Sequence, residues 1–280
     1  MRLYRILFIA LTALLPLRAA TPNSLPEIAV AQPSPSAWDD ISFRIDNTIA
    51  SRYWGSIVGG IFYPGGAVNF TDFTVTKEDS LGSMYFLIGM INPLDTFEYD
   101  DQGGTEYYLG LGHSFDLWKD GNGPPLVGLD VFVLYDAISP IEEMDDDVIE
   151  TRLRLDFPRV PFAQPYIEYY NWQASGNDAP PVGSFIRVGT QRQQPLGISF
   201  QQSELKLKID ASLGFAGEGL FGTDGGLSYY RLVLSLPVKI SEHFSVTPAI
   251  IGQLPGNQDP DAAFVDRPRL FYNLTLSWEF

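Results

Sequence analysis

Charged side chains recur at every second position in one short segment of the chain. Residues 150–156 carry Glu150, Arg152, Arg154 and Asp156, separated by threonine and leucine residues. Alternate side chains of an extended strand point to the same face, so these four groups share one face. Carboxylates and guanidinium groups that share a face form ion pairs and can also orient polar solutes. The spacing therefore predicts a wall of mixed charge.

The same alternation of side chains places charged residues of other segments on one face of their strands. We call this the inward face, because it would point away from lipid if the strands span a membrane. A charged side chain costs about 2–4 kcal/mol at the midplane of a bilayer, so in a spanning strand it should avoid lipid. The predicted inward set is Arg44, Asp46, Asp130, Glu150, Arg152, Arg154, Asp156, Glu168, Arg187, Lys206, Lys208, Asp210 and Arg231.

The residue types needed for nucleophilic catalysis are scarce. After removal of a leader, only His113 and His243 could serve as imidazole bases. His113 is followed by Ser114, and sequential residues of a strand point to opposite faces, so the two cannot form a hydrogen-bonded pair there. A site built from carboxylates alone, around Asp130 or Glu168, stays open. We predict no enzyme, no cofactor and no metal centre.

Twelve segments of about ten residues carry the alternating pattern, and clusters of Gly, Pro, Asp and Asn separate them. No segment has a sustained helical stripe. The predicted strands are Ile41–Tyr53, Val68–Thr76, Ser83–Ile91, Thr105–Leu117, Leu126–Tyr135, Val148–Phe157, Pro165–Trp172, Phe185–Gln193, Glu204–Phe215, Leu227–Val238, Phe244–Gln253 and Leu270–Phe280. The weakest boundary lies at 194–203, where Leu196, Ile198 and Phe200 could extend a strand.

The last nine residues carry the strictest alternation. Apolar side chains occupy every second position, and polar residues stand between them. These apolar residues are Tyr272, Leu274, Leu276, Trp278 and Phe280. A terminal aromatic residue on such a strand resembles the signal read by the machinery that assembles outer-membrane barrels. The alternative, an edge strand of a soluble sandwich, fits poorly because so aromatic a strand is seldom left at a free terminus.

The beginning of the chain has the pattern of an export signal. Arg2 and Arg5 precede an apolar run, Ile6 to Leu15, and residues 1–20 are the predicted signal peptide. Residues 21–40 form a linker containing Pro and Ser, and residues 41–280 form one transmembrane β-barrel. Removing the signal changes the formal charge from −16 to about −19, which argues against a nucleic-acid partner.

Together these patterns predict an all-β, antiparallel, up-and-down barrel of about twelve strands in a bacterial outer membrane. Twelve is an even number, as single-chain bacterial barrels have. If both termini face the periplasm, the longer connections lie outside the cell, which is the usual asymmetry. The expected partners are outer-membrane lipid, the barrel assembly machinery and small polar solutes or ions.

Two interpretations of the charged wall remain open. Opposite charges could pair across a narrow lumen and plug it, or they could line a wetted passage for small hydrophilic solutes. The first gives a structural or adhesin-like barrel whose loops bind a partner, and the second gives a porin-like channel. The acidic run 142–147 could also collect cations at a pore mouth, and divalent-ion binding there is a weaker alternative.

Two short segments carry a resemblance to a known family. Asp46–Gly55 resembles the first strand and following loop of the TorF-like putative porins, and Glu106–Leu117 is similar to a hairpin strand of that family. The resemblance implies an outer-membrane pore of undefined substrate, and it would span the mature chain. It assigns no binding residue.

Overall fold

The structure, a computed structural model of the chain, describes residues 40–51, 67–94, 105–119, 123–137, 147–160, 162–175, 183–201, 203–220, 225–257 and 268–280. The predicted signal peptide and nearly all of the linker lie outside the described residues. So do most of the longer connections, including residues 142–146 of the acidic run.

The described residues form thirteen strands and no helix that is long and apolar enough to cross a membrane. The strands are β1 (Ile41–Ala50), β2 (Val68–Asp79), β3 (Gly82–Pro93), β4 (Glu106–Leu117), β5 (Val127–Ala137), β6 (Val148–Asp156), β7 (Gln164–Ala174), β8 (Ser184–Phe200), β9 (Ser203–Ala216), β10 (Gly226–Ser235), β11 (Val238–Lys239), β12 (Phe244–Pro255) and β13 (Arg269–Glu279).

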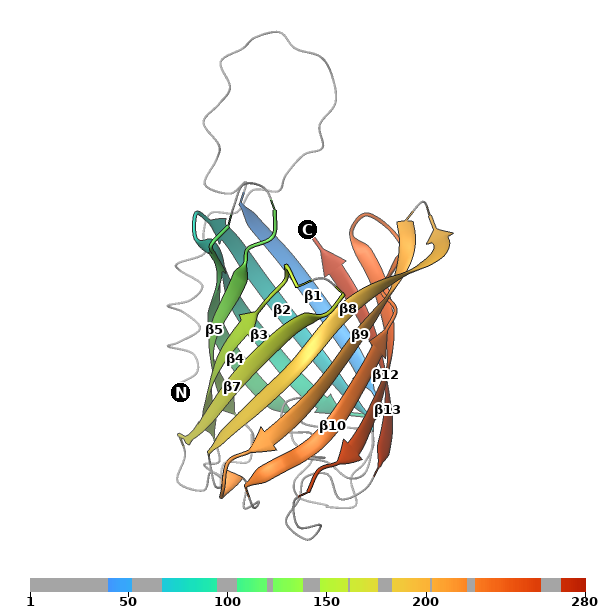
Figure 1. Cartoon of the computed structure of the whole chain (residues 1–280). Coiled ribbons are helices and arrows are strands. Elements are labelled where there is room, and N and C mark those ends of the chain that lie inside the picture. The colour runs from blue at the N-terminus through green and yellow to red at the C-terminus, as the bar shows by residue number, and fades with distance from the viewer. Residues whose placement is uncertain are drawn as a thin grey trace.

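Twelve of these strands close into an antiparallel barrel (Figure 1). Each strand from β1 to β10 pairs with the next, β10 pairs with β12, and β13 pairs with both β12 and β1. The two-residue β11 pairs only with β12 and does not enter the ring. Closure leaves no free sheet edge within the ring, which is what a strand structure needs in lipid, where no water satisfies backbone groups. The predicted fold class is confirmed.

The barrel has two unlike rims. At the terminal rim, β1 begins and β13 ends, and backbone hydrogen bonds join Phe43 to Phe280 there. The C-terminus marks this rim at the top of Figure 1. We call the opposite end of the barrel the loop rim. Connections at the terminal rim are as short as two residues, between β2 and β3, whereas 17 residues separate β1 from β2 at the loop rim. The asymmetry in length matches the prediction, and the direction in which the termini face stays a prediction.

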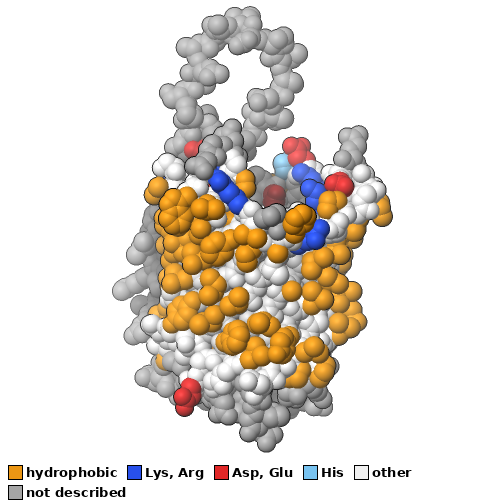
Figure 2. All heavy atoms as spheres, in the orientation of Figure 1, with side chains coloured by type: hydrophobic (Ala, Val, Ile, Leu, Met, Phe, Trp, Pro, Cys, Tyr) orange, Lys and Arg blue, Asp and Glu red, His pale blue; other side chains and the backbone are white. Residues whose placement is uncertain are grey.

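The outer wall is strongly apolar. Figure 2 shows hydrophobic side chains over much of the wall in view, and most of the charged side chains in that view lie at its upper rim. Large outward side chains that are 40% exposed or more include Ile49, Leu111, Val133, Leu153, Ile186, Leu232 and Ile250. A contiguous apolar surface of this kind is typical of a membrane or partner interface rather than of a protein in water.

Strand bounds differ from the predicted ones by three residues or fewer, with one exception. The prediction ended a strand at Gln193, whereas β8 continues to Phe200. It forms a hairpin with β9, and two residues separate the two strands. At the upper right of Figure 1, this hairpin extends beyond its neighbours β7 and β10, whose pairing with it ends at Gln191 and Lys208. Pairing is irregular between Pro195 and Ser199, and Gly197 there has a φ of +66°, a conformation that glycine adopts readily.

Candidate functional site

The strands alternate between an exposed outer face and an inner face that carries the charges. On β7, Ile167 and Tyr169 are 39% and 38% exposed on the outer face, while Glu168 between them is 1% exposed. On β6, Leu153 is 41% exposed, and Arg152 and Arg154 on either side of it point inward. The period of two therefore places the charged residues of both strands on the inner wall.

Strand register aligns four of the predicted charges into a row. Asp130 on β5 lies opposite Arg154 on β6, Arg154 lies opposite Glu168 on β7, and Glu168 lies opposite Arg187 on β8. The row therefore alternates in charge along four adjacent strands. Directly opposed unlike charges stabilise a sheet by roughly 0.2–1 kcal/mol per pair.

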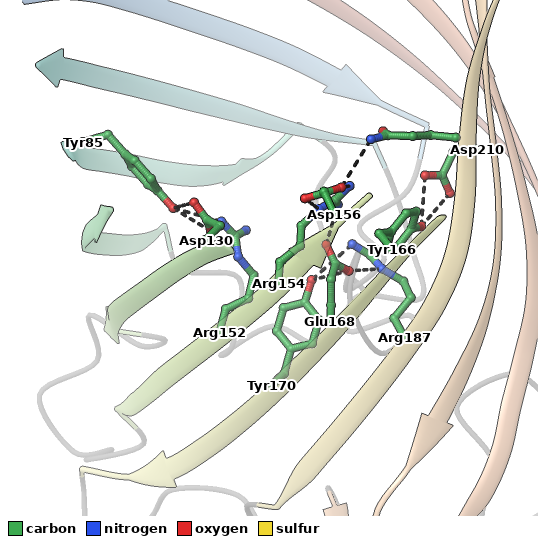
Figure 3. Close-up of polar contacts among 11 residues, drawn as sticks. Tyr85, Asp130, Arg152, Arg154, Asp156, Tyr166, Glu168, Tyr170, Arg187 and Asp210 are labelled. Carbon is green, nitrogen blue, oxygen red and sulfur yellow. Dashed lines mark hydrogen bonds and ion pairs between the residues drawn. The ribbon is translucent and has the colours of Figure 1, made fainter. Parts of the chain in front are cut away.

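Glu168 is the most tightly enclosed member of this row. Its side chain is 2% exposed and accepts a hydrogen bond of 2.6 Å from Arg154. Arg187 donates to its other oxygen, and the hydroxyl of Tyr170 donates to that same oxygen at 3.0 Å. Arg154 also holds Asp156 through two hydrogen bonds of 2.7 and 2.6 Å. Figure 3 shows these side chains converging on one part of the wall.

A second group of contacts surrounds Asp130. It accepts hydrogen bonds from Arg152 at 2.7 Å, from Ser114 at 2.7 Å and from the hydroxyl of Tyr85 at 2.9 Å. The guanidinium of Arg152 also lies 4.8 Å from the ring centre of Phe132. We name the combined group the ion-pair cluster, consisting of Asp130, Arg152, Arg154, Asp156, Glu168 and Arg187.

The ion-pair cluster follows the wall and does not bridge the lumen. Residues of one strand or of neighbouring strands form the ion pairs of Arg44, Arg152, Arg154 and Arg187 with Asp46, Glu279, Asp130, Asp156 and Glu168. Tyr166 extends the network along the same wall, donating to both oxygens of Asp210 on β9 at 3.0 Å. Pairing along a wall holds the long side chains in place without drawing opposite walls together.

Inward glycines position the tyrosine rings of this wall. A Cβ added to Gly189 would come within 2.4 Å of the ring of Tyr166, and one added to Gly112 would come within 2.3 Å of the ring of Tyr85. Each ring therefore lies flat over a glycine of a neighbouring strand, an arrangement that covers exposed backbone. The flat ring directs the Tyr166 hydroxyl at Asp210 and the Tyr85 hydroxyl at Asp130.

Burial of the inner wall changes from one rim to the other. Near the loop rim, four inward-facing residues are 5% exposed or less: Glu106, Glu150, Gln253 and Phe271. Towards the terminal rim, Arg44 has a side chain that is 49% exposed, and Lys208 is exposed as well. The lumen is thus densely packed in the loop-rim half and accessible in the terminal-rim half.

The remaining predicted residues occupy separate places on the same inner face. Arg44 pairs with Asp46 at 2.7 Å and with Glu279 at 3.4 Å, close to the terminal rim. Arg231 is 7% exposed on β10, with its guanidinium 5.4 Å from the ring centre of Tyr229. Lys206 lies on the projecting hairpin. The predicted inward residues thus share a face, and their role in lining a pore stays a prediction.

Sequence reasoning missed the tyrosines that complete the network. Tyr166 and Tyr170 are two residues before and after Glu168, so the period of two already placed them on its face. Neither residue carries a charge, so the rule that assigned charged side chains to the inward face did not select them. The hydroxyl of Tyr85, three strands away from Arg152, gave no signal that could be read from spacing.

The two histidines lie away from the ion-pair cluster. His113 contacts Asp79 at 2.9 Å and stacks against Phe115 on the outer face, and His243 contacts the backbone oxygen of Glu279 at the terminal rim. Within the described ranges, no group of three or more Asp, Glu or His side chains is placed to hold a metal ion.

The final strand contributes to closure of the barrel. Tyr272 and Leu274 are 53% and 40% exposed on the outer face, and Leu276 and Trp278 follow on the same face. Phe280 lies just beyond β13 and is 64% exposed. Their recognition by assembly machinery stays a prediction.

Comparison with known proteins gives only remote likenesses. No family model and no curated protein matches the chain, so the resemblance to the TorF-like putative porins stays an expectation. A solved structure of the KdgM porin shares 9% identity at a TM-score of 0.47, over 85% of this chain and 99% of that one. The β domain of the Bordetella autotransporter Brka shares 14% at 0.44, over 86% and 100%. A bacterial polysaccharide outer-membrane secretin shares 9% at 0.45, over 86% and 98%. At these values, what those proteins do is not transferred to this chain.

Proposed function

We propose that this chain is a passive outer-membrane channel for small hydrophilic solutes or ions. The observation that carries the proposal is the course of the ion-pair cluster, which runs along one wall between neighbouring strands. Charges held at a wall by their neighbours leave the axis of a barrel free for water, and they present fixed dipoles to a passing solute.

The size and the outer surface of the barrel support the same proposal. Twelve strands lie between eight-stranded barrels, whose interiors side chains fill, and porins of sixteen or more strands with aqueous channels. The exposed leucines, isoleucines and valines of the outer wall suit hydrocarbon. In this proposal the terminal rim faces the periplasm and the loop rim faces the outside of the cell.

A second candidate function rests on the dense packing near the loop rim. Glu106, Tyr229 and Gln253 are inward-facing and are 3%, 0% and 1% exposed. A barrel closed at this level would be structural or adhesin-like, with the connections at the loop rim binding a partner. Most residues of these connections lie outside the described ranges.

Single-channel recording separates the two functions. We expect the refolded full chain to give discrete conductance steps in planar lipid bilayers, because water fills the space beside a wall of fixed charges. The control is protein that stayed unfolded in the same refolding, identified by a gel mobility that heating does not change, and it should give none. Folded protein that never produces steps would remove the channel and favour the structural barrel.

A further inference from the structure

A polar pocket opens in the inner wall at the terminal-rim end of β7, β8, β9 and β10. Its volume is about 210 Å³. Six polar residues of the inner face line it: Gln164, Gln191, Gln193, Lys208, Asp210 and Ser235. Val233 completes this face, and Arg192 and Ile209 also border the pocket from the alternate, outward positions of β8 and β9. We name it the terminal-rim pocket. A volume of this size corresponds to roughly seven water molecules, which is room for a single sugar-sized solute.

Direct cross-strand pairing builds this pocket. Gln164 lies opposite Gln191, and Gln191 lies opposite Asp210. Gln193 and Ser235 lie on the two sides of Lys208, each directly opposite it. Because these residues share the inner face and sit on the regular sheet, the backbone holds their Cβ atoms in fixed positions.

Three lining side chains have no hydrogen-bond or ion-pair partner among the described residues: Gln164, Gln193 and Lys208. Every arginine of the ion-pair cluster, in contrast, already contacts a carboxylate. The pocket therefore offers two carboxamides and one ammonium group that water satisfies and a ligand could satisfy instead.

The opposite side of the pocket offers acceptors. Asp210 has both oxygens oriented by the Tyr166 hydroxyl at 3.0 Å, and a carboxylate keeps further acceptor sites beyond two such contacts. Ser235 can accept or donate, and Val233 adds an apolar surface between the polar groups. A complementary ligand carries one negative charge for Lys208 and hydroxyl groups for Asp210 and the carboxamides.

We propose that the terminal-rim pocket is a binding site for small hydroxylated carboxylates of sugar-acid size. This inference deepens the proposed channel and rests on it for its physiological use. The chain as a whole carries a formal charge of −16, so its general field repels anions. A local site with an uncommitted lysine would concentrate such a solute at one end of the lumen against that field.

Isothermal calorimetry on the refolded full chain in detergent micelles tests the site. The probes are gluconate and glucose, which have similar size and hydroxyl content and differ in charge. We expect gluconate to bind at millimolar or lower concentrations and glucose to bind at least fivefold more weakly. Lys208→Gln should weaken gluconate by about five- to tenfold, equivalent to about 1–1.4 kcal/mol, and leave glucose unchanged.

Lys206→Gln is the matched control. Lys206 is inward-facing on the same strand but lies outside the pocket lining, so its loss should change gluconate affinity by less than twofold. Equal binding of gluconate to the Lys208→Gln variant and the unchanged chain would overturn the proposal. So would an equal loss in the control variant, or no gluconate binding at tens of millimolar.

Calorimetry needs no open passage, so the two proposals fail separately. Gluconate binding to a folded chain that shows no conductance steps would reject the passive channel and retain the pocket. Conductance steps from a chain that does not bind gluconate would retain the channel and reject the pocket.

Discussion

Replacing Glu168 by Gln is expected to destabilise the barrel by about 3–5 kcal/mol, the cost of breaking a buried ion pair by removing one partner. The glutamine keeps the shape of the side chain but leaves the guanidinium groups of Arg154 and Arg187 without the carboxylate between them. Tyr170 also loses a charged acceptor. Urea titration of the protein in lipid vesicles, followed by tryptophan fluorescence, measures the change.

Glu279→Gln provides the matched control. The side chain of Glu279 is 64% exposed and contacts Arg44 at 3.4 Å, so its charge is worth no more than about 1 kcal/mol. If both variants unfold at the same urea concentration as the unchanged chain, the ion-pair cluster does not stabilise the wall. Loss of stability in the Glu279 variant alone would place the important charges at the rim instead.

Neutralising Arg152 is expected to raise the ratio of cation to anion permeability by about two- to fivefold. Charges that line a cleft change the local concentration of ions by larger factors than this, so a single charge in the wall is sufficient for the effect. Arg152→Gln leaves Asp130 without its 2.7 Å partner, so the wall gains one uncompensated negative charge. Asp130→Asn should shift the ratio in the opposite direction. Reversal potentials in a salt gradient measure both.

The double variant closes this cycle. With both Arg152 and Asp130 neutralised, the net charge of the wall is restored, and the permeability ratio should return close to that of the unchanged chain. Arg44→Gln, at the exposed terminal rim, is expected to have a smaller effect. If Arg152→Gln leaves the reversal potential unchanged, Arg152 does not face the path of the ions.

Alternation alone predicted the barrel because its physical cause is local. A strand with one face in hydrocarbon and one in water must change polarity at every residue, and twelve such segments were visible between turn residues. Leu153, between Arg152 and Arg154, shows the result, since it is exposed on the outer wall while its neighbours point inward. Closure then follows from the need to satisfy the edges of the sheet.

The contacts within the candidate site depend on strand register, which alternation does not determine. Asp130 lies directly opposite Arg154, yet its ion pair is with Arg152, one step along β6 on the same face. Which carboxylate meets which arginine follows from strand tilt and side-chain reach. The terminal-rim pocket was missed for the same reason, because its glutamines are uncharged and come together only through register.

The predicted strand ended at Gln193 because Pro195 and Gly197 are typical of a strand break. The extension that Leu196, Ile198 and Phe200 had left open is the one the structure shows. Beyond Gln191, β8 has no partner on the β7 side, so a proline there removes no ladder hydrogen bond on that side. Pairing with β9 resumes at Ser199 after the irregular stretch. The alternating Leu196, Ile198 and Phe200 were the signal that the strand continued.

Cysteine accessibility tests the central claim, that one face of each strand meets water in the lumen while the other meets lipid. The chain contains no cysteine, so in each single-cysteine variant the introduced thiol is the one that the reagent can modify. The inward positions are Gln191, Lys208 and Asp210, and the outward positions are Val188, Ile209 and Leu232. In lipid vesicles, we predict that a charged, water-soluble thiol reagent modifies the inward set and spares the outward set. Equal modification of both sets, or modification of the outward set alone, would contradict the assignment of the two faces.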